Sequence, residues 1–319
     1  MGNQESRGRF APSPSGRMHL GNVWAMLAAW LSMRKQGGTM ILRMEDLDPS
    51  RSKQIYADQM MEDLAWLGLS YEEGPDCGGA YGPYTQEERR NLYEEAMNRL
   101  KVQGHLYPCY CSRKDLQAVR APHRGEGANA YPGTCRYLSD EERKLRAEKK
   151  APAMRFLMPD REDCFVDLNY GKQCQSLQSE TGDFILRRSD GIHAYQLAVV
   201  VDDALMGITE VVRGADLLSS SHRQRILYES LGYSSPKFGH VPLLMGRDGR
   251  RMSKRFQSLD LGQLKSIGWK PEELWGLLLF EAGMMEKEEA VTLQEAIEIF
   301  SWETMGQTDL KIDLQRLER

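Results

Sequence analysis

A loop with two prolines and two glycines leads directly into a helical pattern near the start of the chain, at residues 9–22 (RFAPSPSGRMHLGN). Proline fixes φ and glycine removes the side chain, so this loop reaches the helix along a restricted path. The surrounding periodicity predicts, in chain order, a strand at 8–12, a helix from 23 that Gly37 stops, a strand at 40–44 and a helix over 52–68. This order predicts an α/β fold on a parallel sheet with right-handed crossovers.

The composition is that of an ordinary globular chain: 41% of the 319 residues are hydrophobic, 28% are charged, and the mean hydropathy is −0.56. With a net charge of −4, the chain is not held to nucleic acid by bulk charge, so any such contact needs local patches. No apolar run approaches the roughly 18 residues of a membrane span, and the polar N-terminus has no signal-peptide core. We therefore expect a cytoplasmic protein whose six cysteines are thiols or metal ligands, not a disulfide framework.

After the second helix, ordered patterns alternate with one irregular stretch. TQEE at 85–88 predicts a capping box that opens a helix running to about Gly104, and residues 105–150 then lose periodicity, which indicates an insertion. Within it, the charged run 140–150 predicts a solvated helix in preference to a nucleic-acid patch. The continuous LAVVV within 195–203 predicts a strand buried on both faces. Further patterns predict strands at 183–188, 210–214 and 240–244, a serine-capped helix over 219–232 and a helical C-terminal region.

His19, Gly21 and Asn22 belong to the motif HLGN, where the opening loop meets the first helix. A helix N-terminus presents free amides and a partial positive charge, which favour a polyanion. Gly21 lets the backbone approach a ligand closely, and His19 can donate to a phosphate oxygen. The simpler interpretation of this tetrapeptide alone is a rigid turn whose histidine caps the helix.

A second candidate, GRDGRRMSKR at 246–255, follows the predicted last strand with five basic residues and two glycines. A flexible basic loop can close over a developing pyrophosphate and place positive charge where negative charge builds up. Taken by itself, this stretch is more simply an exposed surface loop.

The two candidates together carry a resemblance. HLGN near the start of a parallel sheet and RMSKR after its last strand are similar to the paired signatures of the class I aminoacyl-tRNA synthetases. RFAPSPSG, MEDLDPSR, YQLAVVVDD and VVRGADLL resemble the glutamyl branch of that family, and the resemblance runs from about residue 7 to 256. Within this branch, the chain resembles the shortened members that transfer glutamate to the queuosine base in the anticodon of tRNA(Asp). The resemblance implies a Rossmann-like parallel sheet, a small zinc-binding insertion and a short helical C-terminal region.

The resemblance also implies ligands for individual positions. Substrate L-glutamate would be held by Arg9, Ala11, Ser13, Glu45, Tyr195 and Arg213. ATP would be held by His19, Gly21, Asn22, Met252, Ser253 and Lys254. His19 and Lys254 would be the catalytic residues, and a guanidinium fork suits a carboxylate because it can pair with both oxygens. The chain departs from the family pattern at Asn22, where many members carry histidine, and at Arg251 and Arg255, which flank the second signature.

Three cysteines stand close together in the irregular insertion, as CYC at 109–111 and at the end of YPGTC at 131–135. Thiolates with one further ligand suit Zn²⁺, and the residues alone leave His105, His123 and Tyr131 open as the fourth ligand. The resemblance implies the set Cys109, Cys111, Tyr131 and Cys135, around one structural zinc ion. The remaining cysteines are expected to be ordinary thiols: Cys77, Cys164 and Cys174.

The resulting expectation is a catalytic domain in two halves (1–104 and 183–245), an insertion at 105–182, and the RMSKR loop with a helical region at 246–319. Only 64 residues follow Arg255 (319 minus 255), which predicts that no anticodon-binding domain follows. The expected activity is formation of glutamyl-adenylate from L-glutamate and ATP with Mg²⁺, then transfer to queuosine-bearing tRNA(Asp), by a monomer. Two alternatives are a truncated conventional synthetase that charges tRNA(Glu), and a non-catalytic regulator that binds tRNA or nucleotide.

Overall fold

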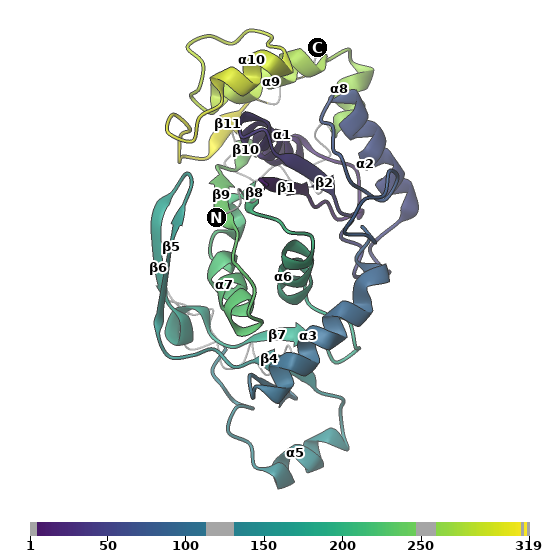
Figure 1. Ribbon diagram of the computed structural model, residues 1–319, viewed down its shortest axis with the longest axis vertical. Helices are drawn as coiled ribbons and strands as arrows, with labels where there is room; N and C mark the ends of the chain where they lie inside the picture. The colour runs from purple at the N-terminus through teal and green to yellow at the C-terminus, as the bar shows by residue number, and fades with distance from the viewer. Residues whose placement is uncertain (1–4, 113–130, 247–259, 314–315, 318–319) are drawn as a thin grey trace.

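The computed structural model describes residues 5–112, 131–246, 260–313 and 316–317. Figure 1 shows an elongated molecule, with helices from the C-terminal region at one end and the small helix α5 at the other. No helix within these described ranges is both long and apolar enough to cross a membrane.

The first four predicted elements are confirmed. Strand β1 (Arg7–Phe10) pairs in parallel with β2 (Thr39–Leu42), and helix α1 (Leu20–Lys35) connects them. Helix α2 (Gln54–Trp66) follows and buries Met60 and Leu64. The buried residues of α1 belong to one large apolar core that also includes residues of β1, β2, α2 and the C-terminal helices. The strand–helix–strand unit therefore packs against the C-terminal region.

The parallel sheet continues on the other side of β1. Strand β8 (Glu210–Gly214) lies beside β1, where the Thr209 amide donates to the Arg7 carbonyl at 2.9 Å. It pairs in parallel with β9 (Lys237–Val241), and helix α7 (Ser220–Ser230) lies between them in sequence. At the far edge of β9, β5 (Glu162–Asp167) adds one parallel bridge and forms a hairpin with β6 (Gly171–Ser176). The spatial order is therefore β2–β1–β8–β9–β5–β6.

The prediction of a strand at 195–203 is wrong, because this stretch lies within helix α6 (Tyr195–Leu205). Each residue of LAVVV is at most 1% exposed, since α6 is enclosed by neighbouring helices (Figure 1). A continuous apolar run is equally consistent with a strand covered on both faces and with a helix covered all round. Here the run is part of an eleven-residue element, a length that suits a helix.

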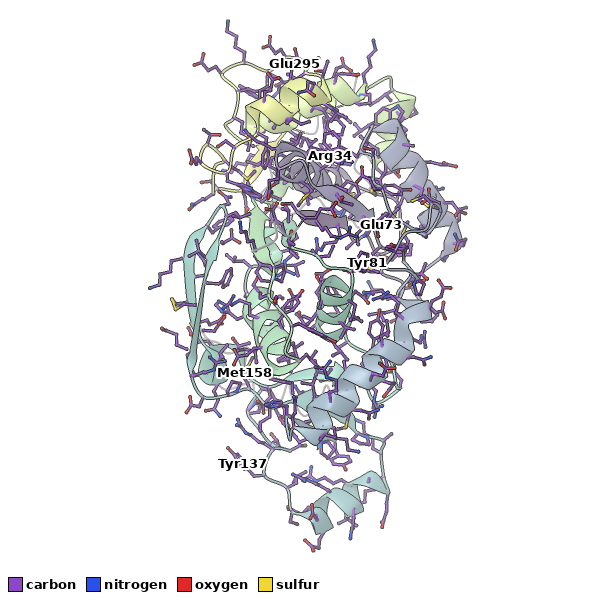
Figure 2. All side chains as sticks on the ribbon, viewed as in Figure 1. Arg34, Glu73, Tyr81, Tyr137, Met158 and Glu295 are labelled. Atoms are coloured by element: carbon purple, nitrogen blue, oxygen red, sulfur yellow. A yellow bond between two sulfur atoms is a disulfide. The ribbon has the colours of Figure 1, made fainter. Side chains whose placement is uncertain are left out.

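The irregular insertion contains its own small sheet. Strands β3 (Leu106–Cys109), β4 (Ala153–Phe156) and β7 (Phe184–Arg187) are antiparallel, with β4 in the middle. Helix α5 (Asp140–Ala147) buries no residue, which confirms the predicted solvated helix, and the nearby Tyr137 points outward (Figure 2). Because β7 lies beyond residue 182, this sheet crosses the predicted domain boundary, and the four domain ranges stay predictions.

Two predicted helix caps take another form. The helix after TQEE begins with a short 3₁₀ turn, η1 (Glu87–Arg89), and continues as α3 (Arg90–Val102). The Thr85 hydroxyl bonds the Glu88 carboxylate, and the Glu87 amide donates to Asp46 Oδ1 at 2.9 Å, so the reciprocal capping box is not formed. Likewise, Ser219 precedes α7 without a side-chain capping bond.

The disulfide Cys164–Cys174 corrects the expectation that both residues are ordinary thiols. The two cysteines are register partners on β5 and β6, so the hairpin places their Cα atoms 4.2 Å apart. Strand register decides this pairing, and the local sequence pattern gave no information on that register. Cys77 is free and exposed, as expected.

The C-terminal region is helical as predicted, with an added strand. Its elements are β10 (Leu244–Gly246), α8 (Leu261–Ser266), α9 (Pro271–Glu281), α10 (Leu293–Ile299) and β11 (Leu310–Ile312). Two short helical turns lie earlier in the chain, η2 (Leu177–Thr181) and η3 (Ala215–Leu217). Strand β11 pairs in parallel with β10, and α10 packs on α1. This end of the molecule therefore supports the first helix of the parallel unit.

Gly276 should be essential for packing this region. A Cβ atom there would lie 1.8 Å from the carbonyl oxygen of Glu289, so helix α9 or the 289–291 segment would have to move. We expect Gly276→Ala to lower the free energy of unfolding by about 2 kcal/mol or more, the scale of overpacking. Urea denaturation measures this. Gly306→Ala is the control, since its Cβ would meet only an ordinary contact at 3.7 Å, and equal losses in the two variants would contradict the packing argument.

Candidate functional site

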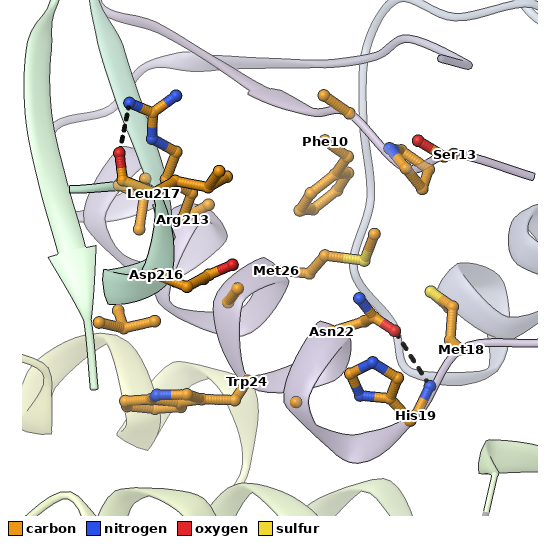
Figure 3. A pocket seen from close by; sticks show the side chains of 18 of the residues that line it. Phe10, Ser13, Met18, His19, Asn22, Trp24, Met26, Arg213, Asp216 and Leu217 are labelled. Atoms are coloured by element: carbon orange, nitrogen blue, oxygen red, sulfur yellow. Dashed lines mark hydrogen bonds between the residues drawn. The ribbon is translucent and has the colours of Figure 1, made fainter. Parts of the chain in front are cut away.

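A cavity of about 550 Å³ opens where β1 and β8 end and α1 begins. Ligands of open α/β sheets bind at this edge, beyond the carboxyl ends of parallel strands. Figure 3 shows Arg213 on one side of the cavity and His19 with Asn22 on the other. The cavity therefore brings together segments that lie far apart in the sequence.

All the predicted ligand-binding residues that fall within the described ranges line this cavity. They are Arg9, Ala11, Ser13, His19, Gly21, Asn22, Glu45, Tyr195 and Arg213. The other three, Met252, Ser253 and Lys254, lie outside the described residues. The opening loop, the MEDLD segment and the start of α6 thus meet at one place.

Backbone hydrogen bonds hold the proline-rich loop in position. The Pro12 carbonyl accepts from the Glu45 amide and the Pro14 carbonyl from the Lys53 amide, both at 2.9 Å. A proline has no amide hydrogen, but its carbonyl remains a full acceptor. The loop is therefore fastened to the chain after β2, which brings Ala11 and Glu45 to the same cavity.

The start of α1 is arranged around His19. His19 is the N-cap residue, and its amide donates to Asn22 Oδ1 at 3.2 Å (Figure 3). A Cβ atom on Gly21 would lie 3.0 Å from two atoms of the His19 ring. Glycine therefore lets the imidazole fold closely over the helix start. The free amides and the dipole of this helix end favour an anionic group in the cavity.

Arg9 and Glu45 share a buried charge network below the cavity. Arg9 Nε lies 3.3 Å from Asp203 Oδ1, and its Nη1 donates to the Val212 carbonyl. Arg43 connects the two sides, with Nη1 2.7 Å from Asp203 and Nη2 3.2 Å from Glu45. Burial raises the pKa of Glu45, while Arg43 and Arg9 oppose that shift. A carboxylate held so far from water is stabilised by a further cation, such as an ammonium group entering the cavity.

Arg213 is held differently from the other cavity arginines. Its side chain is buried and donates to four uncharged acceptors: His240 Nε2, Gln224 Oε1, Ser221 Oγ and the Leu217 carbonyl. Among the described residues, no carboxylate lies within ion-pair distance of it, whereas Arg9 and Arg17 each have one. Burial also lowers the pKa of Arg213. Its guanidinium is thus suited to an anionic ligand.

Sequence reasoning missed the residues that support this site. Arg43, Asp202 and Asp203 are buried and ion-paired, and Arg43 interrupts an otherwise apolar strand pattern. A charged residue in such a run is a signal for a buried pair, and it could have been noticed. His240 and Asp167 carried no comparable signal, because neither belongs to a motif.

The predicted metal ligands also come together. The sulfur atoms of Cys109, Cys111 and Cys135 lie within 4.8 Å of one another, and Tyr131 Oη lies 3.5 and 3.3 Å from the first two. Burial raises the pKa of Cys111 to about 11, and the neighbouring Cys109 and Cys135 add to that shift. Of the alternative fourth ligands, His105 stacks on Phe156 and is not in the cluster, and His123 lies outside the described residues.

Comparison with known proteins identifies relatives over the whole chain. Residues 5–319 match the family model described as "tRNA synthetases class I (E and Q), catalytic domain". A glutamyl-Q tRNA(Asp) synthetase from Symbiobacterium thermophilum is 48% identical over 314 residues, covering 97% of each chain. One from Nitratidesulfovibrio vulgaris is 50% identical, covering 88% of this chain and 87% of its own. The solved glutamate tRNA ligase from Elizabethkingia meningosepticum, in complex with its amino acid, has a TM-score of 0.83 at 29% identity, covering 98% of this chain and 68% of that one.

The contact between Gly21 and His19 generates a prediction. In Gly21→Ala, the added methyl group would displace the imidazole, and we expect ATP to bind about tenfold more weakly, measured by titration calorimetry. If the loss acts through His19, Gly21→Ala should add little in a His19→Ala background, as in a double-mutant cycle. Additive losses in the double variant would contradict this explanation.

Proposed function

The chain belongs to the class I tRNA synthetases of the E and Q group, and on this premise we propose that it activates L-glutamate with ATP and transfers the glutamyl group to queuosine in the anticodon of tRNA(Asp). The observation that carries the first half is the lining of the cavity, which places Arg9, Arg213 and Glu45 at separate positions. Glutamate has the complementary groups, two carboxylates and one ammonium. Its γ-carboxylate would pair with a guanidinium, and its ammonium with Glu45.

In the first step, an α-carboxylate oxygen of glutamate attacks the α-phosphorus of ATP. The new carbon–oxygen–phosphorus linkage forms as the bond to the bridging oxygen breaks, and pyrophosphate leaves. No general base is required because the carboxylate is already ionised. His19 and Lys254 would stabilise the charge on the transferring phosphate, and Mg²⁺ bound with ATP would supply positive charge to the pyrophosphate.

In the second step, a hydroxyl of the queuosine cyclopentene ring attacks the carbonyl carbon of glutamyl-adenylate. An ester forms, AMP leaves, and the hydroxyl proton is released. The choice of this acceptor is supported by the two glutamyl-Q tRNA(Asp) synthetases, which are 48% and 50% identical to the chain. The matches to these two synthetases extend over most of both chains in each comparison. In contrast, this chain covers 68% of the solved glutamate tRNA ligase.

We also propose that Cys109, Cys111, Tyr131 and Cys135 bind one structural Zn²⁺ ion. The Cys111 and Cys135 sulfur atoms lie 3.6 Å apart. Tetrahedral zinc with Zn–S bonds near 2.3 Å requires sulfur atoms about 3.8 Å apart, so the cluster has the right size. Such an ion would hold the 109–111 and 131–135 segments together in an insertion with a small core of its own. It takes no part in the chemistry.

The acceptor can be tested with labelled glutamate, ATP and Mg²⁺ and a set of tRNAs. We expect queuosine-bearing tRNA(Asp) to be labelled, also after removal of its 3′-terminal CCA. Unmodified tRNA(Asp) and tRNA(Glu) should stay unlabelled. Label at the 3′ end of tRNA(Glu) would instead identify a conventional glutamyl-tRNA synthetase. Failure to release pyrophosphate with any tRNA would identify a binding protein without catalysis.

The metal can be tested by zinc analysis of the purified protein. We expect about one zinc ion per chain, and its loss in Cys111→Ser because three ligands hold Zn²⁺ far more weakly than four. Cys77→Ser is the control, since this exposed thiol lies outside the cluster. Full zinc content in both variants would rule out the proposed ligand set.

A further inference from the structure

Three neighbouring strands each place one polar side chain in a row behind the cavity. Arg213 on β8 and His240 on β9 are register partners, and Asp167 at the end of β5 bridges to β9. Arg213 donates its Nε–H to His240 Nε2 at 3.0 Å, and His240 Nδ1 lies 2.6 Å from Asp167 Oδ2. The side chains of His240 and Asp167 have no exposed surface. The row therefore runs from the wall of the cavity into the solvent-inaccessible interior of the protein.

This row has one consistent arrangement of hydrogens. An arginine Nε can only donate, so His240 Nε2 must accept and carries no hydrogen. A carboxylate can only accept, so His240 Nδ1 carries the hydrogen. His240 is therefore neutral, with its proton on Nδ1. Burial lowers the pKa of His240, which keeps a second proton from facing the Arg213 guanidinium.

The Asp167 carboxylate is itself fixed by the backbone. Its Oδ1 accepts the amides of Asn169 at 3.1 Å, Tyr170 at 3.0 Å and His240 at 3.3 Å. These three donors hold Oδ1 in the turn after β5 and leave Oδ2 for the imidazole. Backbone amides therefore orient Asp167, and through it the imidazole of His240.

We propose that Asp167 and His240 are positioning residues of the glutamate site: Asp167 fixes the tautomer of His240, and His240 fixes the plane of the Arg213 guanidinium. This inference rests on the proposed function, because it takes Arg213 as a ligand of glutamate. In this row, Arg213 contacts the neutral imidazole of His240, and the Asp167 carboxylate lies behind that imidazole, out of contact with Arg213. A carboxylate in direct contact would compete with the substrate for the same donors, as Asp203 does for Arg9.

The chain contains a matched pair for comparison. His222 Nδ1 lies 2.8 Å from Asp163 Oδ2, both side chains are buried, and Asp163 also lies on β5. Neither residue lines the cavity or bonds Arg213. This pair has the same imidazole–carboxylate contact without the connection to the site; Asp163 differs in that it also accepts from Arg225 Nε at 3.0 Å.

The test is pyrophosphate exchange with glutamate and ATP varied separately. In Asp167→Asn, the backbone amides keep the amide oxygen in place, so the new NH₂ group faces His240 and moves its proton to Nε2. That hydrogen would oppose the Arg213 Nε–H. We expect the KM for glutamate to rise about tenfold, the scale of an unsatisfied buried donor, with the KM for ATP little changed. His240→Phe should do the same, whereas His240→Gln keeps an acceptor and should retain most glutamate affinity.

Asp163→Asn controls for the loss of a buried carboxylate and should leave the KM for glutamate unchanged. The inference is overturned if Asp167→Asn and His240→Phe leave that KM unchanged, or raise the KM values of glutamate and ATP equally. It is also overturned if His240→Gln is as impaired as His240→Phe. Absence of glutamate-dependent exchange in the unaltered protein would be a different result: it would refute the proposed function and this role with it.

Discussion

The pairing of two consecutive buried aspartates with three arginines is the interaction on which the site depends. Asp202 accepts from Arg89, Tyr93 and Gln86, and Asp203 pairs with Arg43 and Arg9. These partners come from β1, from the residue after β2, and from the stretch that runs from the N-cap of η1 into α3, so α6 holds all of them together. Removing one partner of a buried pair typically costs about 3–5 kcal/mol, because the other charge is left in dry protein. The fold and the proposed glutamate site are therefore supported by the same contacts.

This pairing also explains why α6 is a helix. In a strand, consecutive side chains point to opposite faces, so Asp202 and Asp203 could not reach the same group of arginines. On a helix they are about 100° apart, and both approach Arg43, at 3.6 and 2.7 Å. The apolar residues before them fit either structure. The two aspartates that follow the apolar run, Asp202 and Asp203, distinguish a helix from a strand here, whereas the apolar residues alone do not.

The sequence predicted the site better than it predicted the elements that build it. The strand–helix–strand unit followed from periodicity, and the cavity residues from short motifs that stay together in the fold, such as Arg9 with His19. Three features escaped because they depend on long-range pairing. The helix at 195–205, the Cys164–Cys174 disulfide and the contact of His240 with Arg213 each require knowing which strands or helices are neighbours. Local pattern does not contain that register.

The cavity draws the residues that we propose to bind glutamate from both sides of the predicted insertion. Arg9 and Glu45 precede the 105–182 segment, and Tyr195 and Arg213 follow it. During synthesis, Arg9 and Arg43 leave the ribosome before their shared partner Asp203, which lies 160 residues after Arg43 (203 minus 43). Domains generally fold as units while the chain is made. The proposed glutamate site is consequently complete only late in synthesis, after α6 and β8 have been translated.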